Sequence, residues 1–474
     1  MVAVLPTDAH LQAQFQAGPS MPPDPDVLLL DAQTLKDLEI FESETGGPSL
    51  FDFCNLAQTE GGAKVLRRRM QLPWSNGGRI RATQDSVAFI LANRQVFSML
   101  PSAYTTNRTA YYTHEILPIV SHENRLEFTL GAYSLWVNHV RYYSSIVRGV
   151  QTTCGLIHTL RQLVAQAGLM TPRGELAPLL EEMQVLLTRP RLSVITDQTL
   201  VTGVWRILRL DQVFRIHEKV ALARLLQLVF EIDALVAMAD VTRTNDFVLP
   251  TIESGALGVQ AEGLVHPFVD KAVANAVELD QACRVLFLTG PNMAGKTTYL
   301  RAFATALYLA HLGMGVPARS LSFAPAQRLF SSISLSDDLR NGVSYFRAEA
   351  LRVKAVAEAV ADGYRVVAIM DEPFKGTNVK DAFDASLAIL ERFSAQVDCL
   401  FMFSSHLIEL SEKLSDTGQI DCRYFEADET EGRLRFSYLL QAGVSSQRLG
   451  MRVLREEGVF ELLDKRFAEN PSGA

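Results

Sequence analysis

A glycine-rich loop in the second half of the chain carries residue types that can bind the phosphates of a nucleotide. Residues 285–298 read VLFLTGPNMAGKTT, which fits the pattern G-x-x-x-x-G-K-[ST] at Gly290, Gly295, Lys296 and Thr297. The glycines let backbone N–H groups curve around phosphate oxygens, Lys296 supplies a positive charge, and Thr297 offers a hydroxyl to Mg²⁺. The residues expected to contact the nucleotide are Gly290, Pro291, Asn292, Met293, Ala294, Gly295, Lys296, Thr297 and Thr298.

Two adjacent carboxylates follow another apolar run and can complete such a site. Residues 365–372 read RVVAIMDE, a buried-type strand that ends in Asp371 and Glu372. P-loop ATPases hold Mg²⁺ with an acidic residue at a strand end, and a further carboxylate can orient the attacking water. We assign the metal-binding role to Asp371, together with Thr297. On an extended backbone Glu372 would point the other way and could act as general base toward the γ-phosphate.

A histidine follows a third apolar run. Residues 398–406 read DCLFMFSSH, so His406 lies just beyond a predicted strand, where a sensor of the γ-phosphate would sit. A single histidine is more often a structural hydrogen-bonding group, and only the neighbouring motifs favour the catalytic interpretation.

The elements that must position these side chains are strands and helices in alternation. Residues 297–312 contain good helix formers and no Gly or Pro, so a helix should begin at the loop and direct its N-terminus at the anion. Strands near residues 285, 366 and 399, separated by helices, predict a largely parallel α/β sheet. Ligands of such sheets bind beyond the carboxyl ends of the strands, and all three motifs end there.

The chain divides into three parts by composition and periodicity. Residues 1–26 contain five prolines and read as a flexible leader. Residues 27–245 are dominated by helical periodicity, and their last segment is apolar on most of its circumference, as expected of a central helix in a bundle. Short β-like runs follow, so we place the second domain at 246–474.

Composition indicates a globular protein of the cytoplasm. Hydrophobic residues make up 48% of the 474 and charged residues 21%, and the first 35 residues contain no Lys or Arg, which a targeting signal requires. The apolar stretches are too short to span a membrane. Five scattered cysteines fit a reducing compartment and give no zinc site. A net charge of −8 argues against non-specific coating of nucleic acid but permits a local basic groove.

Four segments together resemble the ATPase domain of the MutS family of DNA mismatch-repair proteins. These are TGPNMAGKTTYLR, SLSDDLRNGVSYFRAE, MDEPFKGTN and FSSHLIEL, and the Asn292–Met293 pair makes the match specific. VHPFV at 265–269, the segment 442–459 and the region around residues 28–73 are also similar to family segments. The resemblance implies an ABC-like P-loop ATPase domain preceded by an all-α core and lever domain.

Functional roles follow from the resemblance residue by residue. It implies that Lys296 and the loop amides bind phosphates, that Asn292 lies near the γ-phosphate, and that His406 acts as sensor. It also implies that Ser344 is offered to the nucleotide of a partner subunit. A homodimer with composite ATP sites is therefore expected, with ATP and Mg²⁺ as cofactors and with DNA and repair proteins as partners.

The sequence also departs from the family pattern. About 26 residues precede the core-like segment, so we expect the mismatch-reading and connector domains to be absent. About 80 to 100 residues separate the early helices from the return helix near 220–242, fewer than long levers and a clamp usually occupy, so a DNA-encircling clamp is not expected. The aromatic residue that stacks on adenine is replaced by Ala272. Ala294 replaces a glycine, which is tolerable if its φ is negative. The family's GRGT is FKGT here.

The sequence leaves three functions to compare. The first is a MutS-like ATPase that switches a dimer engaged on DNA, in repair or recombination. The second is an ATP-controlled scaffold for protein interactions without direct DNA binding, which the negative net charge mildly favours. The third is an ABC-type or chromosome-maintenance ATPase, which the sequence disfavours because it contains no L-S-G-G-Q run.

Overall fold

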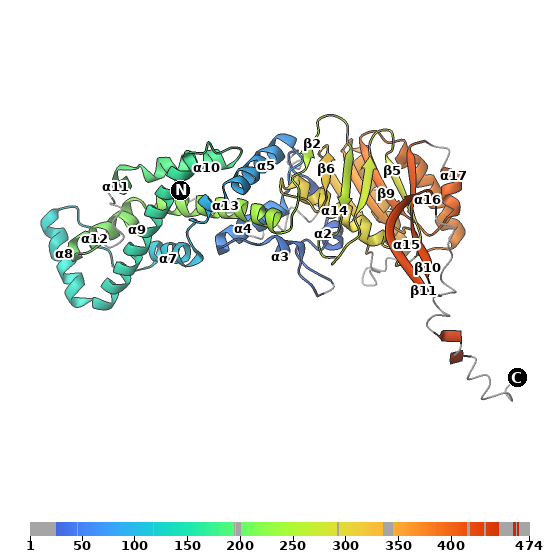
Figure 1. The fold of residues 1–474 in the computed structure, drawn as a ribbon. Coiled ribbons are helices and arrows are strands. Elements are labelled where there is room, and N and C mark those ends of the chain that lie inside the picture. The colour runs from blue at the N-terminus through green and yellow to red at the C-terminus, as the bar shows by residue number, and fades with distance from the viewer. Residues whose placement is uncertain are drawn as a thin grey trace.

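The protein is elongated, with a helical part at one end and a sheet-bearing part at the other (Figure 1). The computed structural model describes residues 25–44, 46–116, 118–193, 195, 201–291, 293–334, 345–414, 418–430, 433–444, 458–460 and 462–463. The predicted leader therefore lies outside the described residues, except for residues 25 and 26. Among the residues described, no helix has both the length and the apolar character needed to cross a membrane.

The N-terminal part is helical, as its periodicity predicts. Its elements are α2 (Ala32–Asp37), α3 (Leu50–Cys54), α4 (Glu60–Gln71), α5 (Gly77–Ala92), α6 (Arg94–Phe97), α7 (Ala103–His114), α8 (Arg125–Asn138), α9 (Val140–Gly168), α10 (Leu176–Leu187), α11 (Pro190–Ser193), α12 (Val204–Gln212), the π-helix η1 (Val213–His217) and α13 (Lys219–Thr244). Helix α13 is the expected central helix. Its buried residues lie on most of its circumference, and it packs against α3, α4, α5, α7 and α10.

Local capping explains where the first helices begin. Asp31 caps α2 by accepting a hydrogen bond from the Thr34 N–H, at 2.9 Å. Ser49 opens α3 with a capping box, in which its hydroxyl and the carboxylate of Asp52 satisfy each other's backbone N–H groups. Each cap involves side chains and backbone groups only three positions apart in the sequence.

The sheet-bearing part contains a seven-stranded sheet and a four-stranded sheet. The strands are β1 (Leu29–Leu30), β2 (Thr251–Ile252), β3 (Val259–Leu264), β4 (Asn275–Leu279), β5 (Val285–Thr289), β6 (Ser320–Phe323), β7 (Arg328–Ser332), β8 (Val366–Asp371), β9 (Cys399–Ser404), β10 (Ile420–Thr430) and β11 (Arg433–Ala442). The large sheet has the order β1-β7-β8-β9-β5-β10-β11, and all its pairs are parallel except β10 with β11. The sheet is therefore largely parallel, as predicted, with β11 as an antiparallel edge strand.

Alternating side chains of the central strands enter two different cores. In β5, Leu286 and Leu288 pack with α14 (Lys296–His311), whereas Val285 and Phe287 join a second core. That second core is covered by α15 (Tyr345–Ala361), α16 (Val379–Ser394) and α17 (Glu409–Leu414). Helices therefore cover both faces of the sheet, which explains why its strands are continuous apolar runs.

The N-terminal segment is built into the edge of the large sheet. Strand β1 pairs with β7 in parallel, with Leu29 opposite Arg328 and Leu30 opposite Leu329. The Asp37 carboxylate, buried in α2, accepts hydrogen bonds from the Ser331 hydroxyl at 2.9 Å and from the Ile333 N–H at 2.7 Å. From β1 at the edge of the sheet the chain thus forms the helical part and then returns to the sheet.

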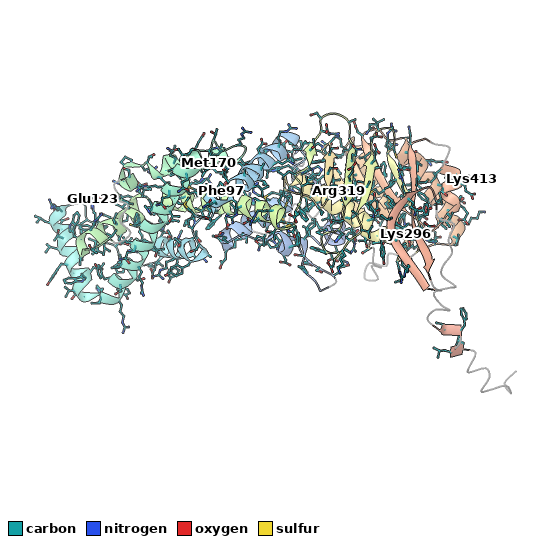
Figure 2. The ribbon with its side chains drawn as sticks, in the orientation of Figure 1. Phe97, Glu123, Met170, Lys296, Arg319 and Lys413 are labelled. Atoms are coloured by element: carbon teal, nitrogen blue, oxygen red, sulfur yellow. The ribbon has the colours of Figure 1, made fainter. Side chains whose placement is uncertain are left out.

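The tip of the helical part, around α8, lies far from the sheet. Glu123, just before α8, lies at the end of the molecule opposite Lys413, and Lys296 lies within the sheet-bearing part (Figure 2). Helix α8 exposes a row of apolar side chains at this far end, and its members are Leu126, Leu130, Tyr133 and Val137. Their spacing of four, three and four residues places them along one side of the helix.

Candidate functional site

The glycine-rich loop joins β5 to α14 as predicted, and its shape depends on left-handed residues. Gly290 has φ 134°, Met293 has φ 70° and Gly295 has φ 106°. A Cβ on Gly290 would lie 2.7 Å from the carbonyl oxygen of Phe425, so the backbone of β10 leaves room only for glycine there. Ala294 is buried and is not one of the left-handed residues, so its methyl group fits the loop.

Lys296 is the first residue of α14 and is almost fully buried, at 4% exposure. Its Nζ donates to the carbonyl oxygens of Gly290, at 2.8 Å, and Pro291, at 3.2 Å. The same Nζ lies 3.4 Å from Oε1 of Glu372. Lys296 therefore connects the glycine-rich loop to Glu372. A phosphate bound in the loop would replace some of these contacts of the ammonium group.

A hydroxyl and a carboxylate meet beside the loop. The Thr297 hydroxyl donates to Oδ2 of Asp371 at 2.5 Å, and the Ser404 hydroxyl donates to Oδ1 of Asp371. Asp371 ends β8 and Ser404 ends the adjacent parallel strand β9, so the sheet register brings them together. Hydroxyl and carboxylate oxygens are the ligand types that Mg²⁺ takes in proteins, so Thr297 and Asp371 fit that ion.

Glu372 faces the loop lysine, but not in the way that an extended backbone would produce. Its φ is 49°, so the chain leaves the strand at this residue, and its N–H donates to the Ser404 carbonyl oxygen at 3.1 Å. Oε2 of Glu372 lies 2.9 Å from Nζ of Lys375. Burial alone would raise the pKa of Glu372, but Lys375, Lys296 and the charge of His406 outweigh it and lower the pKa. The carboxylate is therefore ionised at neutral pH.

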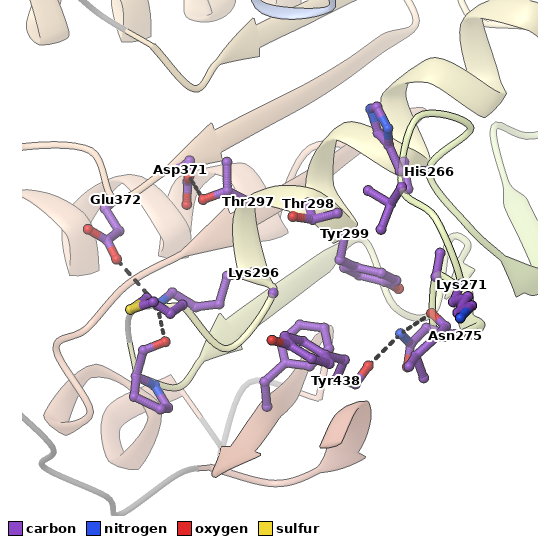
Figure 3. Close-up of a pocket in the computed structure, with 18 of the residues that line it drawn as sticks. His266, Lys271, Asn275, Lys296, Thr297, Thr298, Tyr299, Asp371, Glu372 and Tyr438 are labelled. Atoms are coloured by element: carbon purple, nitrogen blue, oxygen red, sulfur yellow. Dashed lines mark hydrogen bonds and ion pairs between the residues drawn. The ribbon is translucent and has the colours of Figure 1, made fainter. Parts of the chain in front are cut away.

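A cavity of about 690 Å³ extends from these groups to a second end. The first end contains Lys296, Asp371, Glu372 and Lys375. The other end is lined by His266, Asp270, Lys271, Ala272, Val273, Asn275, Phe425 and Tyr438, among others. Figure 3 shows Glu372 and Asn275 on opposite sides of this cavity, with the N-terminal residues of α14 between them.

Tyr438, which no sequence motif indicated, also lines the cavity. Tyr438 has φ 55° and lies in a bulge of β11, because Phe425 pairs with Leu440 whereas Ala427 pairs with Phe436. The Asn275 side chain forms hydrogen bonds with backbone groups at this bulge. Its Nδ2 donates to the Tyr438 carbonyl oxygen at 2.9 Å, and its Oδ1 accepts from the Leu440 N–H at 2.7 Å (Figure 3). An aromatic ring therefore lines the same end of the cavity as Ala272.

The structure brings most of the predicted residues together. Pro291, Met293, Gly295, Lys296, Thr297, Thr298, Asp371 and Glu372 all line the cavity, and so does Ala272. His406 follows β9, is exposed and is not one of the residues that line the cavity. Asn292 and Ser344 lie outside the described residues.

One comparison with known protein families bears on this site. The family model described as MutS domain V matches residues 286–465. The match includes the glycine-rich loop, Asp371, Glu372, His406 and Tyr438. It does not include the helical part.

Proposed function

The chain belongs to the MutS family through this domain, and on that premise we propose that it is a Mg-ATP-dependent ATPase that switches a dimer engaged on DNA. The observation that carries the proposal is the geometry around Lys296. A buried ammonium at the start of a helix, a hydroxyl–carboxylate pair and an ionised glutamate all border one cavity. This is the set of groups that phosphoryl transfer to water needs.

Each group has a distinct part in hydrolysis. The loop N–H groups and Lys296 bind the β- and γ-phosphates, and Asn292 contacts the γ-phosphate. Thr297 and Asp371 would hold Mg²⁺, which when bound neutralises developing phosphate charge. Glu372 accepts a proton from water as the water oxygen bonds to the γ-phosphorus. The bond from that phosphorus to the bridging oxygen breaks, which releases ADP and phosphate.

The remaining predicted residues would sense the nucleotide, bind its base or complete the site of a second copy. His406 senses the γ-phosphate through its position beyond β9. The base of the nucleotide occupies the end of the cavity lined by Ala272 and Tyr438, where the tyrosine ring takes the place of the missing aromatic residue. Ser344 completes the site of a second copy, so hydrolysis depends on a homodimer.

Substitution of the general base tests the proposal most directly. We expect Glu372→Gln to bind Mg-ATP, to hydrolyse it about 10²- to 10⁴-fold more slowly, and to accumulate as the ATP-bound dimer. Phosphate release, nucleotide binding by calorimetry and mass by light scattering measure the three effects. Glu391→Gln, an exposed glutamate on α16, is the matched control. Normal turnover in Glu372→Gln would remove Glu372 from the role of base.

A second function has one observation in its favour. The apolar row on α8 is exposed at the far end of the helical part. An ATP-controlled scaffold would bind a partner protein through this row, whereas DNA binding would use positively charged side chains.

A salt titration of DNA binding separates the two functions. Contacts with phosphates make log K fall with log salt by about 0.9 per neutralised phosphate. The DNA-engaging function predicts this slope with Mg-ATP present. An absence of binding at low salt, in a protein that hydrolyses ATP, would favour the scaffold.

A further inference from the structure

The loop that carries Glu372 has an unusual backbone. Strand β8 ends at Asp371, and two of the next three residues have left-handed φ values although neither is glycine, namely Glu372 at 49° and Phe374 at 67°. Such conformations persist only where the surroundings fix them. Something must therefore hold residues 372–376 in this shape.

Glu349 on α15 supplies the contacts. It is 2% exposed, and its Oε1 accepts from the Lys375 N–H at 3.0 Å while its Oε2 accepts from the Gly376 N–H at 3.2 Å. The two carboxylate oxygens thus bind two successive backbone N–H groups of the loop. A glutamine could not replace both contacts, because its amide nitrogen is a donor and would face a backbone donor.

The helix that carries Glu349 is itself fixed to the sheet. Arg352, one turn further along α15, donates from Nε to the Ser331 carbonyl oxygen of β7 at 3.1 Å and from Nη2 to the Thr34 hydroxyl at 2.9 Å. Phe346 on the same helix packs against Phe374, with ring centroids 6.0 Å apart. Helix α15 is therefore a rigid support for the loop.

Glu349 does not line the cavity, so it has no direct contact with the groups assigned to the nucleotide. Its effect on them passes through Lys375, which it binds by the backbone and which pairs with Glu372 by the side chain at 2.9 Å. A shift of this loop would move Glu372 relative to Lys296 and Thr297 while leaving the glycine-rich loop in place.

We propose that Glu349 is a positioning residue for hydrolysis, which holds the 372–376 loop so that the Glu372 carboxylate faces the cavity. The inference rests on the proposed ATPase function. It adds a residue of α15, outside the cavity, to those on which turnover depends.

The test compares Glu349→Gln with Glu358→Gln, an exposed glutamate on the same helix. We expect Glu349→Gln to bind Mg-ATP with the stoichiometry and Kd of the wild type and to lose about 10- to 100-fold in kcat, because small misplacements of a catalytic group have effects of this size. Glu358→Gln should keep both values. Calorimetry gives Kd and the fraction of active sites, and phosphate release gives kcat for each site.

Glu349→Asp serves as a second variant if Glu349→Gln does not fold. It keeps the charge but is one methylene shorter, so it should retain binding and show an intermediate kcat. A fall in thermal stability and in the fraction of active sites, with normal kcat for each remaining site, would mean that Glu349 is only structural and would overturn the inference. No hydrolysis by the wild type would instead contradict the proposed function itself.

Discussion

Tyr438 places an aromatic side chain in the same cavity as Ala272, the position where the family resemblance leads us to expect one. Ala272 stands where an aromatic residue is expected, and the Tyr438 ring reaches the same end of the cavity from a different strand. Asn275 fixes the tyrosine backbone by two hydrogen bonds. The aromatic surface is therefore supplied by β11 rather than by the segment before β4.

Substitution of Tyr438 should affect affinity more than turnover. Stacking of a base on an aromatic ring contributes about 1–3 kcal/mol, so Tyr438→Ala should raise the Kd for ATP about 5- to 150-fold. Tyr438→Phe keeps the ring and should bind like the wild type. Calorimetric titration with Mg-ATP measures both, and equal affinity of the alanine variant would show that the base does not contact Tyr438.

The sequence predicted those site residues that belong to short motifs of consecutive or nearly consecutive residues. The pattern from Gly290 to Thr297 and the pair Asp371–Glu372 are local, and the structure brings them together because parallel strands end at one edge. Tyr438 and Glu349 were missed because their positions depend on contacts with distant segments. A bulge fixed by Asn275 and a loop with left-handed φ values leave no periodic signal.

At the scale of elements, the close approach of α4 to α13 shows why two adjacent glycines occur in a helix. A Cβ on Gly62 would lie 2.2 Å from Oδ2 of Asp233, and one on Gly61 would lie 2.4 Å from the ring of Phe230. The buried Asp233 carboxylate accepts from the Thr59 N–H at 2.9 Å and from its hydroxyl at 2.6 Å. The start of α4 is thus fastened to α13.

Two glycine substitutions should have opposite effects on stability. Gly155 lies in α9 with open space around its Cβ position, so Gly155→Ala should stabilise the protein by about 0.5–1 kcal/mol through helix propensity. Gly62→Ala gains the same propensity but forces Asp233 to move, and should destabilise by about 1–3 kcal/mol. Urea unfolding measures both. Stabilisation by Gly62→Ala would mean that α4 and α13 can separate freely.

Element types were predicted better than their pairings. The helices of 27–245 and the strands near 285, 366 and 399 follow from periodicity, and α13 is the predicted central helix. Strand β1 was not predicted, because two residues carry too little pattern to indicate a strand. The π-helix η1 was also missed, since its apolar spacing differs little from that of the α-helices beside it.

At the scale of the whole molecule, His311 joins the helical part to the sheet-bearing part. It is fully buried, its Nδ1 lies 2.7 Å from the Trp74 carbonyl oxygen, and its Nε2 accepts from the Ala326 N–H at 3.3 Å. The neutral ring with the proton on Nδ1 satisfies both contacts. Burial lowers the pKa of His311 to about 4, although the hydrogen bond to Trp74 opposes this shift.

The protein should therefore lose stability in mild acid. The folded pKa of His311 lies below the ordinary value of 6.5, so the unfolded chain binds more protons between pH 6.5 and 4 and stability falls as the pH drops. The expected loss from His311 is about 2 kcal/mol between pH 7 and pH 5. Burial lowers the pKa of His266 to about 4 as well, which acts in the same direction.

Urea unfolding at several pH values measures this dependence. His311→Gln can keep one donor and one acceptor but does not titrate, so it should be less stable at pH 7 and show a shallower decline toward pH 5. An unchanged decline in His311→Gln would place the acid sensitivity in other groups.

The pairing of β1 with β7 limits which fragments of the chain can keep the large sheet intact. A fragment that begins at residue 246 would lack β1 and α2, so the outer edge of β7 would have free backbone groups and Arg352 would lose its contact with Thr34. Unpaired strand edges invite association with other chains. The helical part is therefore covalently continuous with the large sheet at both of its ends, and a fragment without β1 would expose a strand edge that the whole chain covers.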